Sequence, residues 1–278
     1  MNIALLFIFG AAIGSFLNVV SVRYQPDKFL FSGKIIGGRS HCPNCKKTLR
    51  WFELVPLLSF MIQGGRCRRC GERLSFQYPA VEIVSGIFFV FVPQYLSSYY
   101  SLPITYYTLS VLWTLVFLTL LVVFLIDLRL SIIPDEANII LLALAILILV
   151  FGGGASFSGS YGTLFGFQGN VWLNHIFAAI IGGAFFGFLI LATKGRGMGL
   201  GDLKLIIPLG FLFGWPDILF IMAAGFIIGA ICGGYLILAY GKKLKSAVPF
   251  GPFLVASSVL IFFFGRTVLD NYFNWLLR

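Results

Sequence analysis

Residues 107–127 read YTLSVLWTLVFLTLLVVFLID, an apolar run that carries no charged residue until it ends at Asp127. The run is long enough for a helix to cross about 30 Å of hydrocarbon, which takes roughly 20 residues. Comparable apolar runs recur at about 2–22, 80–97, 137–151, 173–193, 203–215, 218–240 and 252–269. The sequence therefore predicts an all-α polytopic membrane protein with about eight transmembrane helices.

The composition excludes a soluble domain. Hydrophobic residues make up 59% of the 278 residues, charged residues only 11%, and the mean hydropathy is +0.96. In a soluble protein the net charge of +10 would suggest nucleic acid as a partner, but here eleven of the 20 Lys and Arg residues lie between Arg23 and Arg73. In a membrane protein such a cluster indicates sidedness, so we expect a lipid bilayer and no nucleic acid.

The positive-inside rule places residues 23–79 in the cytoplasm and the N-terminus outside. Alternation along the chain then puts Arg129 and Lys194 in cytoplasmic turns, and it brings Asp127 and Asp202 to the cytoplasmic face. The expected domains are a first transmembrane helix (1–22), a cytoplasmic four-cysteine insert (23–79) between the first and second helices, and a membrane bundle (80–278). No internal repeat is evident.

Four cysteines form two C-x-x-C pairs, Cys42/Cys45 and Cys67/Cys70, separated by 21 residues. Two such pairs can converge on one tetrahedral zinc ion, and four protein ligands leave no open coordination position. We therefore predict a structural zinc site. Disulfides are the competing interpretation, which a reducing cytoplasm disfavours, and redox-active or unligated thiols are another. Cys232, alone in a predicted span, is assigned no function.

Two acids lie at the ends of apolar runs, where a carboxylate is energetically costly and indicates function. Asp202 follows glycines in Gly199–Asp202 (GLGD), and Asp127 ends its span at the helix end where the dipole disfavours an anion. Two neighbouring carboxylates that share one proton can activate water and polarise a scissile carbonyl. The pattern predicts a membrane aspartyl protease with Asp127 and Asp202 as the catalytic pair.

Other acids are weaker candidates. Asp135 is the main rival of Asp127, but it follows Pro134 and precedes an apolar run, so that a helix start explains it. Asp27, Glu53 and Glu72 belong to the basic insert, where solvation or ion pairing is expected. Lys204 and Arg129 are interpreted as positive-inside anchors or, alternatively, as cations that lower the pKa of the aspartates.

Two further segments carry expectations. Pro208 and Gly210 interrupt the short span at 203–215, which we expect to be tilted, partly unwound or re-entrant beside a wet cavity, with a short helix in a thinned bilayer as the alternative. The Gly- and Ser-rich stretch 152–160 is expected to be a flexible outer loop.

The chain resembles the bacterial type IV prepilin peptidases, which are GxGD membrane aspartyl proteases and bifunctional leader peptidases and N-methyltransferases. The resemblance covers nearly the whole chain. The motifs that carry it are Gly14–Val20 (GSFLNVV), the four paired cysteines, Tyr78–Glu82 (YPAVE), Asp127 followed by Ile133–Asp135 (IPD), and Gly197–Lys204 (GMGLGDLK). One departure is Gln77 before Tyr78–Pro79, where the family usually has arginine.

This resemblance implies several properties. Type IV prepilins and pseudopilins would be cleaved after a glycine at the cytoplasmic face of the bacterial inner membrane, by Asp127 and Asp202. S-adenosylmethionine would then methylate the new N-terminal residue, and the cysteine insert accompanies that second activity. No glycine-rich nucleotide loop is visible, so the residues that bind S-adenosylmethionine are unknown from the pattern.

Three alternatives stay open on sequence grounds. A presenilin or signal-peptide-peptidase type of protease shares the G-x-G-D element but would not need the cysteine insert. A zinc-stabilised proton-coupled transporter could also hold intramembrane aspartates, although it would be expected to contain an inverted repeat. A non-catalytic assembly component would bind pilins without needing either aspartate.

Overall fold

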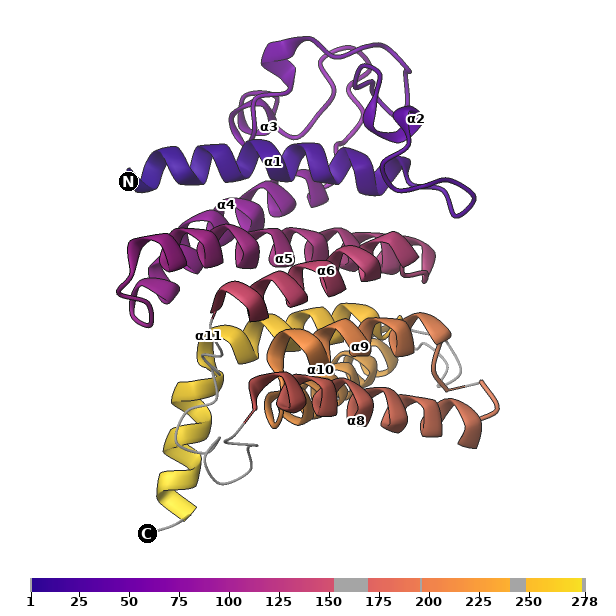
Figure 1. Cartoon of the computed structure of the whole chain (residues 1–278). Helices are drawn as coiled ribbons and strands as arrows, with labels where there is room; N and C mark the ends of the chain where they lie inside the picture. Colours follow the sequence, from indigo (N-terminus) through magenta and orange to yellow (C-terminus); the bar gives the residue numbers. More distant parts are fainter. Residues whose placement is uncertain (1, 153–169, 196, 241–248, 277–278) are drawn as a thin grey trace. The chain divides into compact units, whose positions relative to one another are not determined.

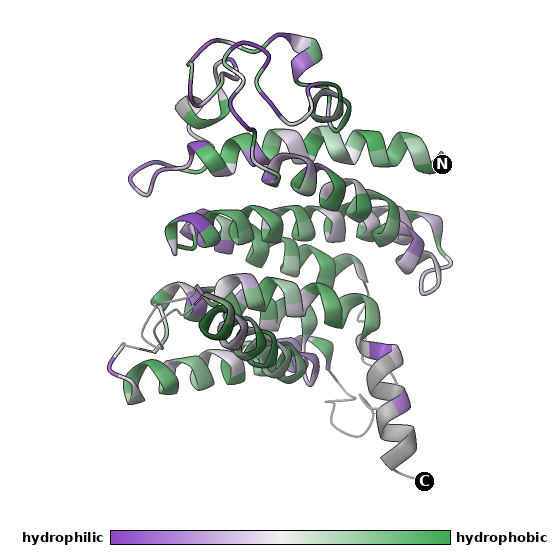
Figure 2. Cartoon of the chain, turned by 180° about the vertical axis from the view of Figure 1, so that it is seen from behind, coloured by the Kyte–Doolittle hydropathy of each residue, from purple (hydrophilic) through white to green (hydrophobic). Residues whose placement is uncertain are grey.

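The computed structural model describes residues 2–152, 170–195, 197–240 and 249–276. They form helices connected by loops, without an extended strand in those ranges, and divide into two compact units, Met1–Leu125 and Ile126–Arg278. Figure 2 shows hydrophobic residues along the long helices and hydrophilic residues concentrated in the segment that follows the first helix. The all-α prediction is therefore confirmed.

Six helices are long and apolar enough to cross a membrane. They are α1 (Ile3–Arg23), α4 (Gln77–Ser97), α5 (Pro103–Leu130), α6 (Asp135–Gly152), α8 (Val171–Ala192) and α10 (Asp217–Tyr240). The two remaining predicted spans are also helical, as α9 (Leu200–Phe213) and α11 (Gly251–Leu276), but neither is among the six: α9 has only 14 residues, and the apolar part of α11 is the shorter stretch Gly251–Thr267. The protein is thus a multi-pass membrane protein, as its composition predicts.

In the first unit, α1 packs closely along α4. A Cβ at Gly14 of α1 would lie 2.6 Å from Ser85 Cβ, and Ser85 donates a hydrogen bond to the Gly10 carbonyl at 2.7 Å. Small residues allow this approach because no side chain separates the two backbones. The insert between these helices contains α2 (Gly33–Ile36), η1 (Trp51–Glu53) and α3 (Leu58–Ile62), and its loops gather beside α1 (Figure 1).

In the second unit, α9 packs against α8 and α6. Asn174 of α8 holds the turn after α9, because its side chain donates to the Trp215 carbonyl (2.9 Å) and accepts from the Trp215 N–H (2.7 Å). The partly unwound form expected near Pro208 is wrong, because α9 is one continuous 14-residue helix. A tilted or re-entrant helix and a short helix in a thinned bilayer both stay predictions. The predicted outer loop at 152–160 lies, beyond Gly152, outside the described residues.

Gly210 brings α9 against α8, since a Cβ there would lie 2.5 Å from Ala179 Cα. We expect Gly210→Ala to lower the free energy of unfolding by about 1–3 kcal/mol, because backbone rather than a flexible side chain must move. Gly187→Ala in α8 is the matched control, since a Cβ there meets nothing within 4 Å. Thermal unfolding in detergent measures both; equal Tm values for the two variants would contradict the close contact.

Candidate functional site

Asp127 and Asp202, 75 positions apart in the sequence, come together in the second unit. Asp127 lies in the last turn of α5 and is 4% exposed, and Asp202 lies in the first turn of α9 and is 7% exposed. The charge of Asp202 acts directly on Asp127. Both carboxyls also face the backbone N–H of Gly251, the first residue of α11. The structure therefore brings together the two acids that the sequence singles out.

The position of Asp202 follows from the glycines before it. Gly199 precedes α9, and its N–H donates to Asp202 Oδ2 at 3.3 Å, so the carboxylate turns back over the start of its own helix. A negative charge is favourable there because the free N–H groups of the first turn give the helix end a positive potential.

The surroundings of Asp127 are different. It sits at the C-terminal end of α5, where the helix potential is negative, and its buried Oδ2 accepts no hydrogen bond within the described residues. A buried carboxyl oxygen without a donor is unusual and is not explained by packing alone. Asp127 thus keeps an acceptor that a proton, a water molecule or a substrate can use.

Gly251, which carries no side chain, is a third residue at this site that the sequence patterns do not single out. A Cβ at this position would lie 2.5 Å from Asp127 Oδ2 and 3.1 Å from Ile133 Cδ1, so only glycine leaves the carboxyl its present place. Ile133 also lies against Gly201, because a Cβ added at Gly201 would be 3.4 Å from the Ile133 Cβ. The turn before α6 thereby contacts the starts of both α9 and α11. The run Phe250–Pro252 (FGP) before an apolar helix was the available signal.

Asp135, the rival acid, is engaged elsewhere. Its carboxylate forms an ion pair with the Lys204 ammonium group, with N–O distances of 2.7 and 2.9 Å, and the two side chains are 65% and 52% exposed. An exposed pair of this kind contributes at most about 1 kcal/mol. Lys204, which the sequence left as an anchor or as a cation for the aspartates, pairs with Asp135.

The four cysteines gather in the first unit. The Sγ atoms of Cys42, Cys45, Cys67 and Cys70 all lie within 4.8 Å of one another, and Cys42 and Cys70 are 3.8 Å apart. A tetrahedral zinc–thiolate centre with bonds of about 2.3 Å has sulfur–sulfur edges of about 3.8 Å, whereas a disulfide brings two sulfurs to about 2.05 Å. The spacing thus fits a four-thiolate zinc site, and all four thiols are free.

The two cysteine turns have the same construction. The Cys42 N–H donates to the Lys47 carbonyl, and the Lys46 N–H donates back to Cys42. In the second turn the Cys67 N–H donates to the Glu72 carbonyl, and the Gly71 N–H donates back to the Cys67 carbonyl. Backbone N–H groups of Cys70 and Arg69 lower the pKa of Cys67 to about 6, which favours the thiolate form that binds metal, whereas burial and the neighbouring sulfurs raise the pKa of Cys70 to about 11. Residues 40–49 and 65–74 are thus a short structural repeat that the sequence did not reveal.

Glu53 differs from its expected solvated role. It is buried (9% exposed) and accepts a hydrogen bond from the Arg50 N–H at 2.7 Å, which closes the start of η1. The expectation was wrong because the side chain is buried and its carboxylate binds a backbone N–H. Asp27 and Glu72 are exposed, and Glu72 accepts from the Asn44 amide at 3.4 Å.

The known proteins to which this chain is similar are all leader peptidases. Residues 8–96 match the bacterial Peptidase A24 N-terminal domain, and residues 114–234 match the type IV leader peptidase family. The chain is 30% identical over 277 residues to a prepilin leader peptidase/N-methyltransferase of Bacillus subtilis, with 99% of both chains covered.

Two other relatives are also prepilin leader peptidase/N-methyltransferases. A prepilin leader peptidase/N-methyltransferase of Aeromonas salmonicida is 29% identical over 99% of this chain and 94% of its own length, and one of Legionella pneumophila is 26% identical over 96% and 93%. No solved structure shows significant similarity to the chain. Given its similarity over almost the full length to these proteins, the chain belongs to the type IV leader peptidase family.

Proposed function

We propose that this protein cleaves the leader of type IV prepilins and pseudopilins after a glycine, with Asp127 and Asp202 as the catalytic acids, and then methylates the new N-terminal residue. The observation that carries the first step is the convergence of the two aspartates on the backbone N–H of Gly251. Family membership favours this function over a presenilin-type protease, a transporter or a non-catalytic assembly component.

The two carboxyl groups divide the work of hydrolysis. The ionised carboxyl takes a proton from water, whose oxygen attacks the scissile carbonyl carbon, while the protonated carboxyl donates a hydrogen bond to the carbonyl oxygen. The tetrahedral intermediate collapses when the C–N bond breaks and the leaving amine takes up a proton from the carboxyl that received one from water. Two adjacent carboxyls can share these roles because like charges disfavour the doubly ionised state.

The substrate reaches this pair from the cytoplasmic side of the inner membrane. Asp127 and Asp202 both lie at helix ends rather than helix centres, and Arg129 and Lys194 lie near the ends of α5 and α8. The positive-inside rule assigns these ends to the cytoplasm. A basic leader in the cytoplasm and an apolar pilin helix in the bilayer would place the scissile bond at the level of the two acids.

The second step would use S-adenosylmethionine, which supplies a methyl group bound to a sulfonium. The amine nitrogen of the new N-terminus forms a bond to that methyl carbon, the carbon–sulfur bond breaks, and the amine loses a proton. Zinc on the four cysteines would hold the insert in shape without taking part, because no coordination position stays open.

The test of this function uses the purified protein in liposomes, a purified prepilin and mass spectrometry of the product N-terminus. Cleavage after the glycine, with an added methyl group only when S-adenosylmethionine is present, is the expected result. Cleavage without a methyl group at any donor concentration would restrict the protein to leader cleavage. An intact prepilin under all conditions would contradict the peptidase assignment.

Gly251→Ala should reduce cleavage sharply. The added Cβ would lie 2.5 Å from Asp127 Oδ2, so the carboxyl has to leave its position opposite Asp202. Misplacing a catalytic group by about 1 Å can cost roughly 100-fold in rate, and we expect at least about tenfold in kcat. Gly233→Ala in α10 is the matched control, since a Cβ there meets nothing within 4 Å. Initial rates of prepilin cleavage measure the effect, and equal rates for the two variants would exclude this role of Gly251.

A further inference from the structure

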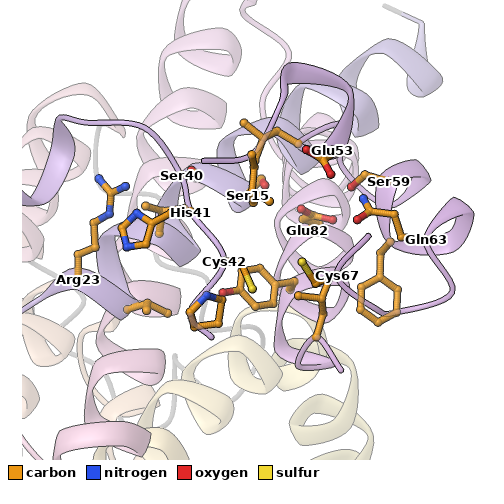
Figure 3. Close-up of a pocket in the computed structure, with 18 of the residues that line it drawn as sticks. Ser15, Arg23, Ser40, His41, Cys42, Glu53, Ser59, Gln63, Cys67 and Glu82 are labelled. Atoms are coloured by element: carbon orange, nitrogen blue, oxygen red, sulfur yellow. The ribbon is translucent and has the colours of Figure 1, made fainter. Parts of the chain in front are cut away.

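A pocket of ≈ 250 Å³ lies within the first unit, between α1, the start of α4 and the insert (Figure 3). Its size is near the lower end of sites for small organic ligands, about 300–1,000 Å³. All of its lining residues fall between Ser15 and Glu82, so it belongs to the first unit alone and is separate from the aspartate pair.

Three motifs that the aspartate pair does not use meet at this pocket. Ser15 and Val19 come from the Gly14–Val20 motif, Cys42 and Cys67 from the two cysteine turns, and Tyr78 and Glu82 from the Tyr78–Glu82 motif. Zinc binding alone explains the cysteines but not the other two motifs. Their convergence indicates a site that the insert and the two helices build jointly.

Glu82 gives the pocket its acidic character. It is 6% exposed, accepts the Leu57 N–H at 2.8 Å and interacts with the Ser15 hydroxyl. No Lys, Arg or His of the described residues lies within ion-pair distance of it. A buried carboxylate without a cationic partner is costly, so a ligand that brings positive charge would be favoured there.

The backbone around Glu82 is held in an unusual conformation. Leu57, whose N–H the carboxylate accepts, has φ +59° and ψ −51°, and the Leu58 N–H donates to the Pro56 carbonyl at 2.6 Å, as in a γ-turn. Such a turn is strained for a leucine and persists only when its surroundings hold it. Glu82 therefore ties the insert to α4 at the wall of the pocket.

The rest of the pocket suits an amphipathic ligand. Glu53 and Gln63 lie toward the same end as Glu82, and Arg23 and His41 lie at the other (Figure 3). The Arg23 guanidinium is already bound to the backbone carbonyls of Ile35, Gly37 and Arg39. Apolar and aromatic side chains complete the walls, among them Val22, Leu49, Leu54, Phe60, Leu74 and Tyr78. An aromatic wall can stack a purine, and the acidic end can face a cation.

We propose that this pocket binds S-adenosylmethionine, with the Glu82 carboxylate facing the sulfonium group. The assignment rests on the methyl-transfer half of the proposed function. The pocket fits S-adenosylmethionine because that molecule combines an aromatic base, a positively charged sulfur and a zwitterionic amino-acid end. The pocket has aromatic, acidic and basic walls that match these three parts. Glu82 acts here on binding and orientation of the donor.

Equilibrium binding of radiolabelled S-adenosylmethionine to the purified full-length protein, without prepilin, tests the assignment. Glu82→Gln should raise Kd at least about tenfold, because the amide keeps the shape and removes the charge. For S-adenosylhomocysteine, whose sulfur is neutral, the same substitution should raise Kd distinctly less. Asp27→Asn, an exposed acid of the insert outside the pocket, is the matched control and should bind both ligands as wild type does.

A second variant tests the location independently of charge. Val19→Trp fills the pocket from α1 and should abolish binding, while zinc content and Tm report whether each variant keeps its fold. Wild-type affinity retained in both Glu82→Gln and Val19→Trp would overturn the site, and an equal loss for both ligands in Glu82→Gln would overturn the role of Glu82. Wild-type protein that cleaves prepilin but binds no donor would instead refute the proposed methylation.

Discussion

Asparagine at position 127 or 202 should abolish leader cleavage. Asn has nearly the size of Asp but can neither take the proton from water nor give one to the leaving amine. General acid–base catalysis contributes about 10²–10⁴-fold, and we expect kcat to fall by about 10³-fold in each single variant. The double variant should be no slower than either single one, since the two carboxyls act as a unit. Initial rates of prepilin cleavage in liposomes measure all three.

Asp135→Asn is the matched control for this experiment. It makes the same chemical change at an acid near Asp127 in the sequence, but its carboxylate is exposed and paired with Lys204. We expect its rate to stay within about twofold of wild type, because an exposed ion pair contributes little. Cleavage at the wild-type rate by either Asp127→Asn or Asp202→Asn would refute the two-acid mechanism. A loss of rate in Asp135→Asn as large as theirs would show that Asp135 is one of the catalytic acids.

Loss of the metal should unfold the insert. Structural zinc sites contribute apparent binding free energies of about 10–16 kcal/mol, and the insert has few regular elements to replace that contribution: α2, η1 and α3 span four, three and five residues. We expect chelation or Cys67→Ser to make residues 23–79 sensitive to protease. Methylation should fail before cleavage does, because the aspartate pair belongs to the other unit.

Cys232→Ser is the control for the zinc prediction. This cysteine lies in α10, outside the four-cysteine cluster, and should affect neither metal content nor protease sensitivity. Metal content by elemental analysis, limited proteolysis and the two activities are measured on the same preparations. An insert that stays resistant to protease after its zinc is removed would contradict a structural metal and leave redox-active or unligated thiols as the explanation.

Much of the fold can be read from local features of the sequence. Each predicted apolar run corresponds to a helix, because backbone groups in hydrocarbon must be paired within their own segment. The C-x-x-C spacing likewise depends on a local turn, and the four sulfurs do converge. The division into 1–22, 23–79 and 80–278 and the role of each site residue stay predictions.

Contacts between distant segments could not be read in this way. The sequence singles out Asp127 and Asp202 by their energetic cost at helix ends. The N–H that both carboxyls face comes from Gly251, which has no charge or side chain and is indicated only by its place in the run Phe250–Pro252 before an apolar helix. Lys204 lies two positions from Asp202 and pairs with Asp135 instead. The pocket at Glu82 depends on a covering loop whose hydrogen bond from Leu57 has no sequence signature.

The physical reason is the range of the interactions involved. Hydropathy, helix length and C-x-x-C turns depend on neighbouring residues, so the sequence alone determined a polytopic helical protein with a four-cysteine insert and two helix-end aspartates. Backbone donors, ion pairs and cavities arise when packing brings remote helix ends together. Only the tertiary structure therefore decided that the Gly251 backbone lies beside both aspartates and that three separate motifs enclose one pocket.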